Sequence, residues 1–198
     1  GKHQRVQSEV DREWAELQQI HIARRFSGGG TVYHDLGNVN LTFIETVSRL
    51  PDFKTYLHRV LEFFVSIGLT AEGDERLGIY LHGLKISGSA QCVYKNRVLY
   101  HCTLLYDTDM TILNKVLNPE GKIEEKESVP VYAVPSVRSA VTNISNYLPM
   151  ETIEDFKKTV FQYFSKGQSA VAFNEWELGV IDKLRKEKYI RDEWIFSR

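Results

Sequence analysis

The sequence predicts one domain of the α+β class, in which helices flank an antiparallel-rich mixed sheet. Residues 77–107 are rich in β-forming side chains and contain two hairpin turn signals, His82-Gly83 and Lys95-Asn96. Two stretches, residues 53–64 and 152–164, carry apolar and aromatic side chains at helical spacing. No repeat, low-complexity tract or linker divides the 198 residues, so we expect a single domain over residues 1–198.

The composition is that of a globular protein, with 42% hydrophobic and 26% charged residues. The net charge of −1 gives no electrostatic reason to expect nucleic-acid or membrane binding. No apolar run is long enough to span a bilayer. The two cysteines, Cys92 and Cys102, form no CxxC pair, which argues against a disulfide framework or a zinc site and favours a reducing cytoplasm.

Capping residues predict where several helices begin and end. Ser8 can cap a helix over residues 8–20, and Pro51 opens a helix that Gly68 is suited to end. Asp109 or Thr108 can cap a helix through residue 117. The other expected elements are a short strand at residues 22–23, a strand at 40–45, a long lid-like loop at 120–135, a short helix within 136–148, an amphipathic helix at 152–164, an edge strand at 170–173 and a solvated helix at 176–189.

The turn at Lys95-Asn96 also predicts a strand register. If the hairpin closes there, facing residues have numbers that sum to about 191, which places His101 opposite Ala90. A slip of one residue would turn the side chains to the other face, so the register is a specific test of the prediction.

Two stretches carry candidate chemistry. Residues 24–38, read as RRFSGGGTVYHDLGN, contain three consecutive glycines beside two arginines. Such a run suits a sharp turn that a ligand can approach closely, although a plain glycine turn with an incidental arginine pair fits as well. In the second stretch, Lys85 is followed by small residues on a predicted strand, which leaves room for a ligand beside the backbone.

Four ordered motifs resemble the lipoate–protein ligases. They are ARRFSGGGTVYHDLGNVNLTFI (residues 23–44), GLKISGSAQ (83–91), YHCTLL (100–105) and SVRSAVTNI (136–144). The resemblance covers nearly the whole chain and implies the fold shared by biotin ligases and the catalytic core of class II aminoacyl-tRNA synthetases. It also implies a two-step reaction, in which lipoate and ATP give lipoyl-AMP and pyrophosphate before the lipoyl group passes to a lysine amine.

The same resemblance implies the substrates, partners and site residues. The implied substrates are ATP and lipoate, and the implied ion is Mg²⁺, for which the resemblance assigns no ligands. The implied acceptors are lipoyl domains of 2-oxoacid dehydrogenase E2 components or the glycine cleavage H protein. Lys85 matches the family's catalytic lysine, and residues 118–138 match a segment that closes over the adenylate. The implied binding residues are Arg24, Arg25, Ser27, Gly28, Gly29, Gly30, Thr31, Val32, His34, Asn38, Lys85, Ser89, Ala90, His101 and Thr103.

Backbone N–H groups of a glycine turn can form an anion nest for a phosphate, and an arginine could add a charge-assisted donor. An ammonium at Lys85 would neutralise charge that builds up during both steps. The alternatives are a surface arginine pair, an exposed strand lysine, and a His34 that only supports its own turn.

The sequence departs from the family pattern in three ways. Leu77-Gly78 replaces the family's Asn-Asp before the lysine strand, which puts metal handling or adenylation in doubt. Cys102 and Ala140 replace a glycine and an arginine of two other motifs. In the family a β-α-β unit precedes the element that opens this chain at Gly1, so we expect the N-terminal part of the domain to be missing from this sequence. We also expect no C-terminal accessory domain.

Two other functions compete with a ligase. An octanoyl or lipoyl amidotransferase needs a cysteine nucleophile, and Cys92 and Cys102 are the candidates, although both also suit ordinary strand packing. A non-catalytic paralogue that binds lipoate or lipoyl domains is the third hypothesis, and Leu77 and Gly78 favour it.

Overall fold

The computed structural model describes residues 1–117, 139–148 and 152–196. Contacts between Cα atoms divide the chain into two compact units. The first comprises Gly1–Tyr33, Asn114–Val137 and Gln168–Arg198, and the second comprises His34–Leu113 and Arg138–Gly167. The predicted loop at 120–135 lies outside the described residues.

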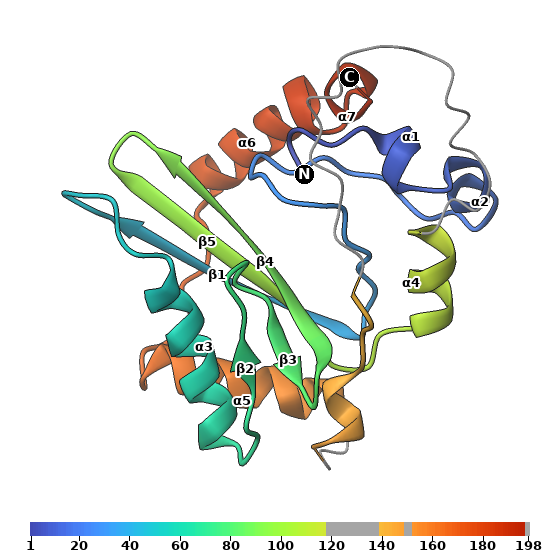
Figure 1. The fold of residues 1–198 in the computed structure, drawn as a ribbon. Coiled ribbons are helices and arrows are strands. Elements are labelled where there is room, and N and C mark those ends of the chain that lie inside the picture. The colour runs from blue at the N-terminus through green and yellow to red at the C-terminus, as the bar shows by residue number, and fades with distance from the viewer. Residues whose placement is uncertain (118–138, 149–151, 197–198) are drawn as a thin grey trace. The chain divides into compact units, whose positions relative to one another are not determined.

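The second unit is built on a five-stranded antiparallel sheet with flanking helices, which confirms the predicted α+β class (Figure 1). The strand order is β1-β5-β4-β3-β2. The strands are β1 (Asn38–Thr46), β2 (Glu72–Gly73), β3 (Ile79–Leu81), β4 (Leu84–Tyr94) and β5 (Arg97–Leu105), and the helices of this unit are α3 (Lys54–Ser66), the 3-10 helix η1 (Ile144–Asn146) and α5 (Ile153–Ser165). Sequence reasoning did not predict the two-residue strand β2.

Both predicted hairpin turns are present. Lys95, with a φ of 55°, lies in the turn between β4 and β5, and Ala90 pairs with His101 as the turn signal predicted. His82 and Gly83 join β3 to β4 with φ values of 49° and 76°. Positive φ at both central residues is the geometry that matches the twist of a two-residue hairpin.

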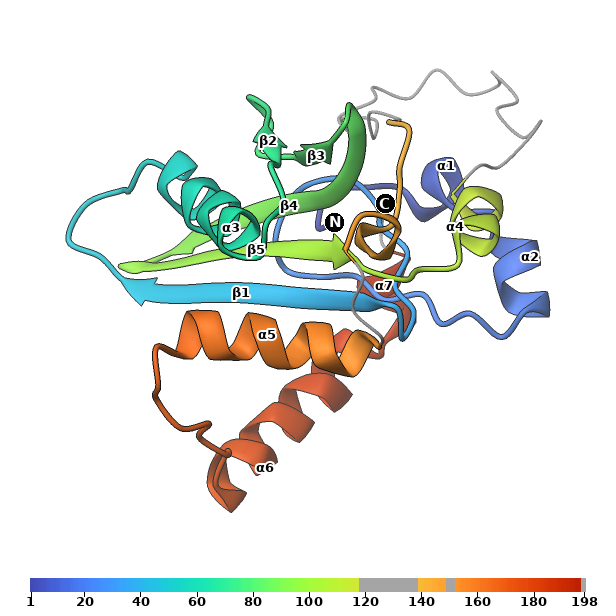
Figure 2. The same ribbon diagram turned by 90° about the horizontal axis from the view of Figure 1, so that it is seen from below.

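Strand β4 bends strongly at its beginning, where it leaves β5 and carries β3 and β2 with it (Figure 2). The pairing of β3 with β4 shifts register between Ile79 and Tyr80, as expected at a β-bulge. At this bend a second segment pairs with Lys85 on its backbone. The Lys85 N–H donates to the Ala140 carbonyl at 2.8 Å, and the Thr142 N–H donates to the Lys85 carbonyl at 3.0 Å.

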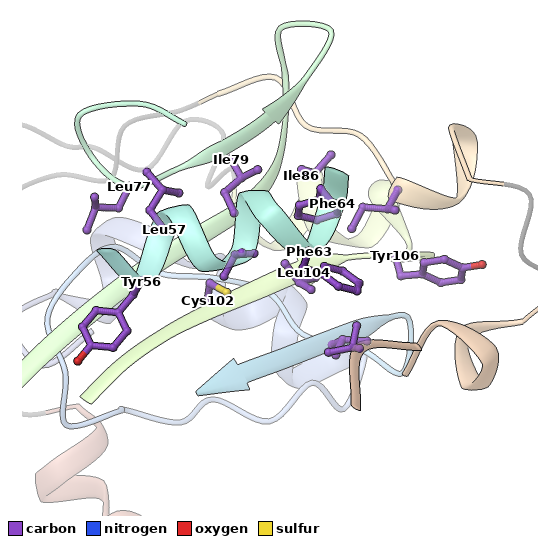
Figure 3. Close-up of a cluster of buried hydrophobic side chains, with 14 of the residues drawn as sticks. Tyr56, Leu57, Phe63, Phe64, Leu77, Ile79, Ile86, Cys102, Leu104 and Tyr106 are labelled. Atoms are coloured by element: carbon purple, nitrogen blue, oxygen red, sulfur yellow. The ribbon is translucent and has the colours of Figure 1, made fainter. Parts of the chain in front are cut away.

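One aromatic core joins the sheet to α3 and α5. Phe63 of α3 lies 6.1 Å from Phe156 of α5 between ring centroids, and Tyr56 stacks on Tyr100 of β5 at 5.3 Å. Figure 3 shows side chains of α3 gathered with those of β3, β4 and β5, the Cys102 sulfur among them. The aromatic stripe predicted for residues 53–64 is therefore core, and burial of such side chains is the main stabilising contribution of the unit.

The predicted end of α3 at Gly68 is confirmed, whereas the helix begins at Lys54 and not at Pro51. Thr152 caps α5 by accepting from the Asp155 N–H, and Gly68, with a φ of 84°, follows the end of α3. Asp109 is the cap of α4 (Met110–Val116), which runs across the division between the units, because its carboxylate accepts from the Ile112 N–H at 2.9 Å.

The first unit begins differently from the prediction. In place of one helix over residues 8–20 capped by Ser8, the structure has α1 (Val6–Glu9) and α2 (Arg12–Leu17). The break occurs because Val10 is extended, and Asp11 then caps α2 by accepting from the Trp14 N–H at 3.0 Å.

The C-terminal part of the first unit is helical, as expected for residues 176–189. Helix α6 (Glu175–Leu184) begins at a capping box of Asn174 and Glu177, continues as the π-helix η2 (Arg185–Tyr189) and is followed by α7 (Asp192–Ile195). The strands expected at residues 22–23 and 170–173 were wrong. Within the described residues neither segment pairs with a strand, and Val171 is 95% exposed. The described residues contain no helix of the length and apolarity that crossing a membrane requires.

Candidate active site

The glycine loop in the first unit is held by the second arginine of the pair. The Arg25 guanidinium donates to the carbonyl oxygens of Gly28 at 2.6 Å and Gly30 at 2.8 Å, and to the Ser27 hydroxyl at 3.1 Å. Gly29 between them has a φ of 83°, which favours glycine. Burial lowers the pKa of Arg25. Arg25 therefore shapes the loop from within by binding its carbonyl groups.

Arg24 has a different set of partners. Its side chain is 5% exposed, and it donates to the carbonyl oxygens of Gly1, Lys2, Gln4 and Ile195 at 2.7–3.1 Å. The Arg24 carbonyl in turn accepts from the Trp194 indole N–H at 2.8 Å. These contacts give Arg24 a structural role, since it ties the start of the chain to α7 within the first unit.

The remaining predicted residues of the first unit follow the loop. The Thr31 N–H donates to the Glu9 carboxylate at 3.4 Å, so an anionic group already lies at this backbone donor. Val32 is 40% exposed. With Arg24, Arg25, Ser27 and the three glycines, they account for all the predicted binding residues that belong to the first unit.

In the second unit, one face of the sheet collects several predicted residues. Side chains alternate along a strand, and the register pairs Ala90 with His101 and Gly88 with Thr103. On the neighbouring strand the register pairs Asn40 with Thr103, and the Thr103 hydroxyl donates to the Asn40 amide oxygen at 3.0 Å. This face is opposite the one that carries Tyr100 and Cys102 in the aromatic core. We call Asn38, Asn40, Gly88, Ala90, His101 and Thr103 the polar sheet face.

The polar sheet face has open space and an unused donor. A Cβ built on Gly88 would meet no atom within 4 Å, so the strand is accessible there. Asn38 is 8% exposed, and its amide oxygen accepts from the Asp35 N–H at 2.7 Å. Its buried amide nitrogen has no hydrogen-bond partner among the described residues. A buried donor of this kind is costly without an acceptor, so a ligand acceptor would satisfy it.

Of the other predicted residues of this unit, Ser89 lies away from the polar sheet face. Ser89 alternates to the core-facing side of β4, and its hydroxyl donates to the Leu77 carbonyl at 2.9 Å. This bond supports Leu77, whose φ of 61° is unusual for a residue with a side chain. His34 precedes β1 and is exposed.

Lys85 lies at the bend of β4 beside an acidic side chain. Its Nζ is 5.9 Å from the centroid of the Tyr80 ring, and the Tyr80 hydroxyl donates to the Asp74 carboxylate at 2.9 Å. A Cβ built on Gly78 would lie 3.2 Å from both Lys85 Cε and Asp74 Oδ1, so the two side chains border the same space. Among the described residues Lys85 has no ion-pair partner.

A family model described as the lipoyl protein ligase A/B catalytic domain matches residues 1–165. The chain belongs to this family. Over 100% of its length it is 34% identical to lipoate–protein ligase 1 of Staphylococcus aureus, 32% to lipoate–protein ligase LplJ of Bacillus subtilis and 31% to probable lipoate–protein ligase A of Mycoplasma pneumoniae. It covers 60%, 61% and 58% of them, so it spans about three fifths of the length of these curated relatives.

Solved structures support the same family. The chain matches a bipartite lipoate protein ligase of Thermoplasma acidophilum, studied with its E2 lipoyl domain, with a TM-score of 0.82 at 26% identity over 99% of this chain and 78% of that one. It matches lipoate-protein ligase A bound with ATP with a TM-score of 0.79 at 26% identity, over 99% of this chain and 80% of that one. The predicted family resemblance is thereby confirmed.

The cysteines of this ligase-family chain do not form a nucleophilic centre. Cys102 is 1% exposed in the aromatic core, and burial raises the pKa of its thiol to about 12. A buried thiol of raised pKa is a poor nucleophile. Cys92 is half-buried near the end of β4 and pairs with Leu99 of β5. Neither arrangement supports the amidotransferase alternative.

The sequence prediction missed four residues that border the site: Asn40, Asp74, Tyr80 and Gly88. Gly88 could have been found from the correctly predicted β4–β5 register, because it pairs with Thr103. Asn40 could not, because its pairing with Thr103 belongs to the β1–β5 register, which was not predicted. Asp74 carried a weaker signal. It stands four residues before Gly78, and only the folded loop shows that its carboxylate accepts from the Gly78 N–H at 2.7 Å.

Proposed function

We propose that the protein is an ATP-dependent lipoate–protein ligase that makes lipoyl-AMP and transfers the lipoyl group to a lysine of an acceptor domain. The observation that carries the proposal is the position of Lys85, a lysine without an ion-pair partner among the described residues, on the strand that also exposes the open Gly88 position. Its relatives of 31–34% identity over the whole chain are named as ligases of this class.

In the proposed reaction, Lys85 acts in both steps. In the first, a carboxylate oxygen of lipoate attacks the α-phosphorus of ATP and pyrophosphate leaves. In the second, the acceptor amine attacks the carbonyl carbon, AMP leaves and the amine loses a proton. In the first transition state negative charge is held on the α-phosphate oxygens, and in the second it develops on the carbonyl oxygen beside the leaving AMP. An ammonium at this place stabilises both.

The other residues bind and orient the substrates in this proposal. The glycine loop, held in shape by Arg25, offers backbone N–H groups of the kind that can bind a phosphate. On the polar sheet face, the amide nitrogen of Asn38 needs an acceptor, and a carbonyl or phosphate oxygen would provide one. The open position at Gly88 leaves the strand accessible to the lipoyl chain.

ATP brings its own requirement for a divalent cation. The described residues contain no group of three or more acidic, histidine or cysteine side chains that could hold a metal ion. Mg²⁺ is commonly held by one or two carboxylates together with substrate phosphates. We propose that Mg²⁺ arrives with ATP, is held largely through the phosphates and neutralises their charge.

We also propose lipoyl domains as the acceptors, specifically those of 2-oxoacid dehydrogenase E2 components and the glycine cleavage H protein. Support comes from the bipartite ligase of Thermoplasma acidophilum, whose structure was studied with its E2 lipoyl domain. The low cysteine content makes the reducing cytoplasm the expected location.

The proposed function can be tested by whether lipoylation requires ATP and free lipoate or proceeds from an acyl carrier protein. Protein carrying this chain would be incubated with an E2 lipoyl domain, lipoate and Mg²⁺, with and without ATP, and the acceptor mass would be measured. The proposal predicts a lipoyl mass increase and pyrophosphate release that both require ATP, and no modification when the acceptor lysine is replaced by arginine. Acylation from octanoyl acyl carrier protein without ATP would show an amidotransferase instead. Binding of lipoate without any acceptor modification would show a non-catalytic paralogue.

A further inference from the structure

The Asp74 carboxylate borders the space around the Lys85 side chain. Asp74 follows β2, and Lys85 lies at the beginning of β4, so the β3 hairpin brings them to the same place. Gly78 makes this possible. A methyl group there would come within 3.2 Å of Asp74 Oδ1, Lys85 Cε and Tyr80 Cε2, which is tighter than ordinary van der Waals contact.

The Asp74 carboxylate is held in one orientation by three donors. Its Oδ1 accepts from the backbone N–H of Gly78 at 2.7 Å and of Arg76 at 3.0 Å, and its Oδ2 accepts from the Tyr80 hydroxyl at 2.9 Å. Burial alone would raise the pKa of Asp74. The hydrogen bonds from Gly78, Tyr80 and Arg76 and the charge of Lys85 outweigh that effect, so the pKa lies below its ordinary value. The carboxylate is therefore a fixed negative charge at neutral pH.

Tyr80 is fixed as well. Its hydroxyl interacts with both Asp74 and the Ser139 side chain, and burial followed by the bond to Asp74 raises its pKa, so it stays a protonated donor. Ser139 belongs to the segment whose next residue, Ala140, accepts from the Lys85 N–H. The backbone of Lys85 is thus held on two sides, by β3 and by this segment, while its ammonium has a long flexible stem and no ion-pair partner among the described residues.

We propose that Asp74, oriented by Tyr80 and by the backbone of the Gly78 loop, is a positioning residue for Lys85. Its fixed charge draws the ammonium toward one side of the accessible space without a direct ion pair, so the ammonium stays available to an adenylate. Gly78 keeps that space open. The inference rests on the proposed ligase function, because it assigns Asp74 a role only through Lys85.

Binding of a non-hydrolysable sulfamoyl analogue of lipoyl-AMP tests the inference by calorimetry. Four variants would be compared with the parent: Asp74→Asn, Tyr80→Phe, Lys85→Met and the double variant Asp74→Asn/Lys85→Met. Glu75→Gln is the matched control, since this exposed neighbour pairs with Lys54 and not with Lys85. Thermal unfolding of every variant shows whether the fold is kept.

We expect Asp74→Asn to weaken analogue binding about tenfold and Tyr80→Phe to weaken it less, because a displaced reactive group loses part of its interaction with the ligand. Glu75→Gln should bind as the parent does. In the Lys85→Met background, Asp74→Asn should have no further effect, since residues that act through one another are not additive.

Equal losses from Asp74→Asn with and without Lys85 would overturn the positioning role and show that Asp74 acts on the loop or on Mg²⁺. Unchanged binding in a well-folded Asp74→Asn variant would overturn it too. Failure of the parent itself to bind the analogue would count against the ligase function, which keeps the two hypotheses distinguishable.

Discussion

At the scale of single residues, the two adjacent arginines differ in their acceptors. Arg24 is buried and bonded to four carbonyl groups from both ends of its unit, whereas Arg25 bonds the glycine loop. Arg24→Ala should destabilise the protein by roughly 2–4 kcal/mol, because it leaves several buried carbonyl groups without a donor. Arg25→Ala should cost less stability and should weaken lipoate binding, because the loop loses its internal support.

Urea unfolding and lipoate titration of both variants separate these roles. Full lipoate affinity in Arg25→Ala would mean that the loop keeps its shape without the guanidinium. An Arg24→Ala variant as stable as the parent would contradict the structural role of Arg24.

The cysteines give a second prediction at this scale. At pH 8, iodoacetamide should modify Cys92 much faster than Cys102, because the Cys102 thiol is buried and its pKa is raised to about 12. The raised pKa also means that the unfolded thiol loses its proton first, so this group's contribution to stability is lost as pH rises from about 9 toward 12.

Peptide mass mapping after partial alkylation measures the order of modification. The Cys92→Ala/Cys102→Ala variant should keep ATP-dependent lipoylation, although loss of the core sulfur should cost roughly 1 kcal/mol of stability. Complete loss of transfer in this variant while it remains folded would revive a thioester mechanism.

At the scale of secondary-structure elements, the β4–β5 hairpin offers a way to block the site without harming the fold. Gly88 pairs with Thr103, and a Cβ at Gly88 meets open space. Gly88→Val should therefore leave stability unchanged or raise it slightly, because valine favours strands. The same side chain should fill the space beside the polar sheet face and weaken lipoate and analogue binding by at least tenfold, a loss of about 1.4 kcal/mol.

Thermal unfolding and calorimetric titration of Gly88→Val test both halves of this prediction. Gly83→Val is a useful contrast, since its φ of 76° makes any side chain strained and should lower stability. A folded Gly88→Val variant with parental affinity would place the ligand away from this face.

Local signals also explain how much of the fold could be predicted. The Lys95-Asn96 turn sets the register of β4 and β5, so the facing of Ala90 and His101 follows from sequence alone. The split of the first helix at Val10 does not, because Ser8 and Asp11 both suit a cap and tertiary contacts decide between them. The place of Asp74 beside Lys85 likewise does not follow from the sequence, since the hairpin and bulge around Ile79 and Tyr80 bring its carboxylate to the space that Lys85 borders.

At the scale of the whole molecule, the predicted ligand residues divide between two compact units. The glycine loop belongs to the first unit, and Lys85 and the polar sheet face belong to the second. The order of the motifs along the chain was enough to predict the family and the residues of both units. Such a resemblance does not depend on how the residues are arranged in space. Both proposed steps depend on the ammonium of Lys85.

The most direct test compares Lys85→Ala and Lys85→Arg with the parent in a lipoylation assay that follows pyrophosphate release and acceptor mass together. Lys183→Ala, at an exposed lysine of α6, is the control and should be fully active. We predict that Lys85→Ala keeps its thermal stability but loses on the order of 10²–10³ in the rate of lipoyl-AMP formation, the usual effect of removing one charge-stabilising donor. Lys85→Arg should recover little of it, because its guanidinium cannot take the place of a compact ammonium. A folded Lys85→Ala variant that lipoylates its acceptor at the parental rate would contradict the account.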